Sequence, residues 1–94
     1  MKSRDAYIAK MKLQLDELNI TIKELELKAK LASLETREKY DVEIVKMRQQ
    51  YQVALDKLTE LKLSSEDAWK TMVAETEKVR DALVKSYHYF KSQL

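Results

Sequence analysis

Glycine, proline and cysteine are all missing from this 94-residue chain. Glycine and proline form the turns of most globular domains, so their absence argues against a fold of many short elements. Without glycine there is no phosphate-binding loop, and without cysteine there is no thiolate zinc site and no disulfide. The lack of cysteine also fits a reducing compartment.

The chain also lacks a large excess of charge of either sign. The chain has 18 basic and 16 acidic residues, a net charge of +2, and both signs are spread evenly along it. Such a chain has no strong field for nucleic acid or an anionic membrane. No apolar run approaches the roughly 18–20 residues of a membrane span, and residues 1–14 lack the apolar core of a secretory signal. We therefore expect a soluble, cytoplasmic protein.

Residues for catalysis are scarce. His88 is the only histidine, so the Glu-x-x-His pairs of di-iron bundles cannot be built within one chain. The many carboxylates would need a concave, partly dry site to shift their pKa values, and straight helices offer little concavity. The sequence therefore predicts no enzyme, with no catalytic, cofactor-binding or metal-binding residue.

What the chain does contain is a long heptad pattern of apolar residues among good helix formers. The steps alternate between three and four over Ile8, Met11, Leu15, Leu18, Ile22, Leu25, Ala29 and Ala32, and again over Ile44, Met47, Tyr51, Ala54, Leu58 and Leu61. The join through Thr36 and Tyr40 has steps of four, which predicts a less regular stretch near residues 34–44 and no break. We expect one helix over about residues 4–62.

The one expected break is Leu63-Ser64-Ser65-Glu66-Asp67. Ser64 as N-cap, followed by two acids, is typical of a helix start. A turn at about 63–65 and a second helix over about 66–92 follow, and the alternative is one unbroken helix of about 90 residues.

These elements predict an all-α fold made of a single domain, residues 1–94. The long helix and the shorter helix would form an antiparallel coiled-coil hairpin that assembles into a helical bundle. Only residues 33–62 of the long helix would be covered, and its first half would project. The expected hairpin core consists of Ile44, Met47, Tyr51, Leu58, Leu61, Trp69, Met72, Val79 and Leu83.

A second apolar stripe lies nearly opposite the heptad seam of the N-terminal half. It comprises Leu13, Ile20, Leu27 and Leu34, spaced seven apart, with Leu31 beside them. A helix that is apolar on two opposed faces needs covering on both. The stripe therefore predicts an oligomer interface, in its simplest form a dimer of crossing antiparallel long helices. A docking face for another protein or for a lipid surface is the alternative.

The aromatic residues have two interpretations. Trp69 is expected to be a core side chain that locks the end of the hairpin, and the alternative is an exposed anchor for a partner. Tyr87, Tyr89 and Phe90, with Lys85 and Lys91, could stack nucleic-acid bases. The small net charge favours packing instead, so no nucleic-acid partner is predicted.

Several segments resemble a group of small bacterial coiled-coil proteins of uncharacterised function, often described as stress-associated and occasionally as apolipoprotein-like. The most distinctive is Ser65-Glu66-Asp67-Ala68-Trp69; the others are Asp5-Ala6-Tyr7-Ile8-Ala9-Lys10, Gln14-Leu15-Asp16-Glu17-Leu18, Leu25-Glu26-Leu27-Lys28-Ala29 and Lys57-Leu58-Thr59-Glu60-Leu61. The likeness spans nearly all of the chain and implies a non-enzymatic helical protein without catalytic residues. It implies no role for a tryptophan pair, because Arg80-Asp81-Ala82-Leu83 stands where such tails commonly carry a second tryptophan.

Two functions thus stand as hypotheses. The first is a self-associating structural or interaction protein, a scaffold or adaptor that acts under stress. The second is an amphipathic protein that binds a membrane or lipid surface.

Overall fold

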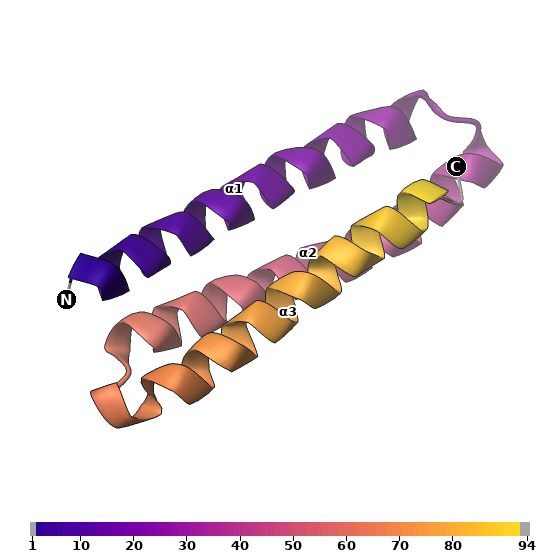
Figure 1. Ribbon diagram of the computed structural model, residues 1–94. Helices are drawn as coiled ribbons and strands as arrows, with labels where there is room; N and C mark the ends of the chain where they lie inside the picture. Colours follow the sequence, from indigo (N-terminus) through magenta and orange to yellow (C-terminus); the bar gives the residue numbers. More distant parts are fainter. Residues whose placement is uncertain (1, 93–94) are drawn as a thin grey trace.

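The computed structural model describes residues 2–92, and this part of the chain forms three helices and no strand. They are α1 (Lys2–Leu31), α2 (Leu34–Leu63) and α3 (Glu66–Ser92). The helices run in alternating directions and lie along one long axis (Figure 1). The molecule measures 50 × 19 × 18 Å. The predicted all-α class is confirmed.

The prediction of one helix over residues 4–62 is wrong, because the chain turns at Ala32 and Ser33. A helix of that length would be on the order of 90 Å long, whereas the longest dimension of the molecule is 50 Å. Ser33 has an extended backbone (φ −61°, ψ 159°) and is the N-cap of α2. Its Oγ accepts a hydrogen bond from the Thr36 backbone N–H at 3.4 Å.

The side chain of Arg37 closes the same turn from the other side. Its Nε donates to the carbonyl oxygen of Ala29 at 3.2 Å, and its Nη2 donates to that of Lys30 at 2.8 Å. These carbonyl groups lie in the last turn of α1, where backbone donors run out, and the Ala29 oxygen also accepts from the Ala32 N–H at 3.2 Å. One serine and one arginine thus provide the caps that end α1 and begin α2.

The second turn consists of Ser64 and Ser65, within the segment predicted at 63–65. Ser64 is the C-cap of α2. Ser65, and not Ser64 as the sequence suggested, takes the N-cap role in α3, since its Oγ accepts from the Ala68 backbone N–H at 3.3 Å. Glu66 and Asp67 lie in the first turn of α3, where their negative charges interact favourably with the positive end of the helix dipole.

Because α1 folds back on the other helices, its N-terminal half does not project. Met11 and Leu15 of the heptad seam are 2% and 0% exposed. Two core clusters result, one around Ile22, Met47 and Leu83 and the other around Leu15, Leu58 and Leu61. All nine residues of the expected hairpin core belong to these clusters or pack against them.

Leu83 tests whether α3 contributes to the central core. Its side chain is fully buried between helices, so Leu83→Ala should lower the free energy of unfolding by about 2–5 kcal/mol through lost burial and a residual cavity. Leu63→Ala is the matched control, because Leu63 is 83% exposed and its loss should change stability by less than about 0.5 kcal/mol. Urea unfolding followed by circular dichroism measures both. Equal losses in the two variants would contradict this packing.

Candidate functional site

The main surface feature is an apolar stripe on the outward face of α1. Leu13, Ile20 and Leu27 are 59%, 57% and 61% exposed, although the heptad seam of the same helix is buried. Leu31 ends α1 and Leu34 begins α2 on the other side of the first turn, and they are 90% and 72% exposed. The structure thus places all five predicted interface residues on the surface of the single chain, with no helix of that chain covering them.

Helix geometry explains why this face stays open. Residues spaced seven apart lie on one line, and this line is nearly opposite the seam that packs on α2 and α3. A three-helix arrangement covers one side of each helix and leaves the other to solvent. We call Leu13, Ile20, Leu27, Leu31 and Leu34 the outer stripe.

Charged side chains of both signs flank the outer stripe. On the helix surface, residues three and four positions away from a given residue are its neighbours. For Ile20 these are Asp16, Glu17, Lys23 and Glu24, and for Leu27 they include Lys30. The flanks therefore alternate in charge and do not form a field of one sign.

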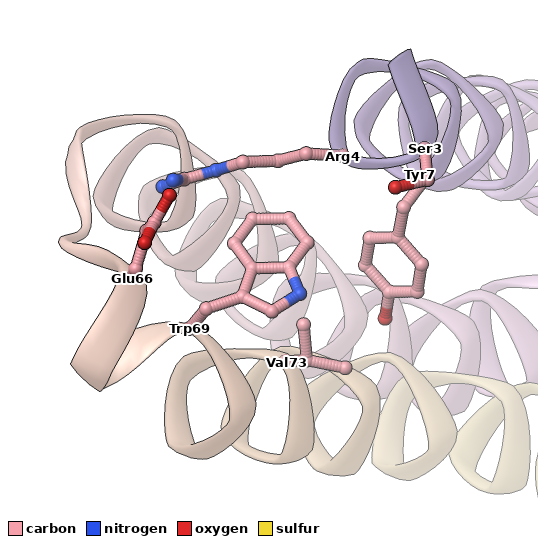
Figure 2. Close-up of a pocket in the computed structure, with 6 residues that line it drawn as sticks. All are labelled: Ser3, Arg4, Tyr7, Glu66, Trp69 and Val73. Carbon is pink, nitrogen blue, oxygen red and sulfur yellow. The ribbon is translucent and has the colours of Figure 1, made fainter. Parts of the chain in front are cut away.

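A second feature lies where the start of α1 meets the α2–α3 turn (Figure 2). The guanidinium carbon of Arg4 lies 4.4 Å from the centre of the Trp69 ring. The ring of Tyr7 contacts Trp69 edge-on, with 5.8 Å between centroids and an interplanar angle of 76°. A shallow cavity of about 380 Å³ is lined by these side chains together with Ser3, Glu66 and Val73.

Arg4 also caps the end of α2. Its Nη2 donates to the carbonyl oxygen of Leu61 at 3.1 Å and to the Oγ of Ser64 at 2.8 Å, and it contacts the Ser64 carbonyl oxygen as well. Stacking on an aromatic ring and donating several bonds at once suit the planar guanidinium. The cluster of Arg4, Tyr7 and Trp69 therefore fastens α1 to the second turn. Trp69 lies near the start of α3, beside the end of α2. Its partner Arg4 could not be identified from the sequence pattern.

The phenol of Tyr7, in this cluster, has a pKa above its ordinary value. Burial, and then the hydrogen bond that its hydroxyl donates to Glu77 Oε1 at 2.8 Å, raise the pKa of Tyr7 to about 12. Both causes favour the neutral phenol. The bond joins α1 to α3 and depends on a proton that is present at neutral pH.

The C-terminal aromatic residues are only partly available to a ligand. Phe90 is buried and stacks edge-on against Tyr40, with 5.1 Å between their centroids. Tyr87 packs against the core, and Tyr89 is 63% exposed beside a groove of about 780 Å³ that Val42 and Glu43 also line. A platform of several stacked bases would need more than one exposed ring.

Residues 2–92 contain neither a metal-binding group of side chains nor a membrane-spanning helix. In this range no group of three or more histidine, aspartate or glutamate side chains is placed to hold a metal ion. None of the three described helices is both long and apolar enough to cross a membrane. Comparison of the chain with family models, curated proteins and solved structures finds no match. The function is therefore inferred from the surface itself.

The Tyr7–Glu77 bond gives a test in alkaline solution. A group whose pKa is raised on folding stabilises the fold below its unfolded pKa, near 10, and loses this contribution as the pH rises through about 12. Tyr7→Phe should remove this part of the alkaline destabilisation, so the difference in stability between the parent and the variant should shrink from pH 9 to 12. Urea unfolding at each pH measures it, with Tyr89→Phe as the exposed control. A difference that stays constant with pH would contradict the assignment.

Proposed function

We propose that this protein is a non-enzymatic helical interaction protein that self-associates through the outer stripe of α1. The observation that carries the proposal is the exposure of four large aliphatic side chains on one face of α1, Leu13, Ile20, Leu27 and Leu31, with Leu34 exposed at the start of α2. Scattered exposed apolar residues are normal on protein surfaces, but a contiguous apolar line of this kind marks an interaction site. In this proposal the outer stripe becomes the core of a larger bundle formed by two copies.

The free energy available from covering the stripe is substantial. Full burial of a leucine or isoleucine side chain contributes about 1.5–3 kcal/mol, and these five are already partly covered by their own helix. About 4–8 kcal/mol per chain then remains to be gained. Association costs about 4–15 kcal/mol of lost motional freedom, so two chains that cover their stripes together reach the range of a measurable dimer.

The spacing and the charges favour a second copy as the occupant. Steps of seven, seven and four along α1, from Leu13 to Leu31, suit a partner helix that packs in coiled-coil fashion. The flanks contain Asp16 and Glu17 as well as Lys23 and Lys30. A strip with both signs can be complementary to itself, whereas a strip of one sign needs a partner of the opposite sign.

A lipid surface fits the flanking charges less well. Helices that lie on membranes usually carry lysine and arginine on their polar face. Here Asp16, Glu17 and Glu24 flank the central part of the stripe and would be repelled by anionic headgroups. The lipid-binding hypothesis therefore becomes one outcome of the test described below.

The resemblance to stress-associated helical proteins supports a role for the dimer as a scaffold or adaptor in the cytoplasm. A rigid bundle with no catalytic group would act by holding partners at a fixed spacing. This role rests on the resemblance alone, and the self-association rests on the outer stripe.

The double variant Ile20→Lys/Leu27→Lys tests self-association. Both positions are exposed in the single chain, so the fold should be kept, while two ammonium groups per chain enter the centre of the proposed interface. We expect the dimer dissociation constant to rise at least about 100-fold, which corresponds to about 2.7 kcal/mol. Sedimentation velocity over a concentration series measures the mass, and circular dichroism verifies the helix content.

The control is Val53→Lys/Leu63→Lys, which adds the same charge at exposed apolar positions of α2. It should keep the dimer. A parent protein that stays monomeric at high micromolar concentration would contradict the proposal. If the parent is monomeric and co-sediments with vesicles of mixed neutral and anionic lipid, and the first variant does not, the outer stripe is a lipid-binding face instead.

A further inference from the structure

The turn between α1 and α2 is short and contains no left-handed residue. It consists of Ala32 and Ser33, and no described residue has a positive φ. Ser33 has φ −61°, which is already a helical value, and only its ψ of 159° is extended. Joining α1 and α2 into one helix therefore requires rotation about the ψ bond of Ser33.

The sequence around the turn favours helix on both sides. Ala32 and Leu34 are among the better helix formers. The heptad pattern of α1 resumes in α2, and no proline or glycine lies between the two helices. The joined helix is opposed by the cap at Ser33, whose Oγ accepts from the Thr36 N–H at 3.4 Å and donates to the Thr36 Oγ1 at 3.0 Å, and by the Arg37 side chain on the end of α1. All of these contacts are local to the turn.

The second turn is held much more firmly. There Arg4 reaches across from α1 and donates to Leu61 and Ser64, and Trp69 packs beneath its guanidinium group. No residue from α3 caps the first turn in the contacts that the structure shows. Of the two turns, the first is therefore the one that can open without loss of a long-range contact in the turn itself.

We propose that this chain also forms a domain-swapped dimer, in which α1 of each copy packs on α2 and α3 of the other. The partner is a second copy of this chain, and the surface that binds it is the buried seam of α1, with Met11, Leu15, Ile22 and Leu25. In the swapped dimer α1 and α2 form one continuous helix through Ala32 and Ser33. The inference goes beyond the proposed function, since it uses the face of α1 opposite to the outer stripe.

The swapped dimer keeps the contacts that α1 makes outside the first turn. The seam would be buried in the same two clusters, and the polar links of Glu26 to Arg48 and of Gln14 to Arg80 would form between chains. The two states differ only at the turn and in the cost of association, which is why such exchange is an accessible route to dimers.

Leu34→Pro separates the two states. Leu34 is the first residue of α2, a position that accepts proline because its backbone N–H has no partner within the helix. Proline there also holds the preceding residue in an extended conformation, which Ser33 already has, and it prevents a continuous helix. Leu34→Ala is the matched control, because it removes the same side chain and still permits the continuous helix.

Inter-chain cross-linking reads out the swap. The chain has no cysteine, so Glu26→Cys and Arg48→Cys can each be made as a single-thiol protein. The two proteins are mixed, unfolded in urea, refolded at high micromolar concentration and treated with a short bis-maleimide. Residues 26 and 48 are paired within the single chain, so a covalent link between the two proteins reports α1 of one packed on α2 of the other.

We expect a 26–48 cross-linked heterodimer in the parent and Leu34→Ala backgrounds, with at least a tenfold lower yield in the Leu34→Pro background. Absence of the heterodimer in the parent, or equal yields with Leu34→Pro and Leu34→Ala, would overturn the inference. The background Ile20→Lys/Leu27→Lys separates a failure of the domain swap from a failure of the proposed function. This variant should keep the 26–48 cross-link, although it weakens association through the outer stripe.

Discussion

Each helix of this protein carries one apolar seam that must be hidden from water, and the other structural features depend on this constraint. A single helix cannot hide its own seam, and two helices of unequal length would leave part of one uncovered. Three helices of nearly equal length, Lys2–Leu31, Leu34–Leu63 and Glu66–Ser92, bury all three seams against one another. Hydrophobic burial is the largest favourable term for such a fold, so the turns form where they make the helices match in length.

The all-α class and the second turn could be predicted from the sequence, because both have local signals. Ser64 and Ser65 followed by two acids interrupt the heptad pattern and suit a helix start. The first turn has a weaker signal. Ser33 has a good helix former on each side, and the heptad seam continues past it in steps of four through Thr36 and Tyr40, so periodicity alone extends the helix. The long-range burial of the α1 seam and the cap from Arg37 decide against it.

The outer stripe shows how far a pattern can lead. Its spacing identified four residues that share a face of α1 and a fifth, Leu34, that the turn places at the start of α2, and the structure leaves all five exposed on the single chain. The cluster at the second turn had no such signal. Arg4 and Tyr7 are far from Trp69 in sequence, and only the return of α1 alongside α3 brings them together. A long-range contact of this kind has no local periodicity from which it could be inferred.

The position of Trp69 has an experimental consequence. It is the only indole in the chain, and its ring lies between the Arg4 guanidinium and the edge of Tyr7, two groups that belong to α1. The emission spectrum and quenching of this ring therefore depend on whether the N-terminal residues of α1 pack beside it. The protein thus has an intrinsic fluorophore at the contact between α1 and α3, and the fluorescence of this tryptophan reports their separation without any added label.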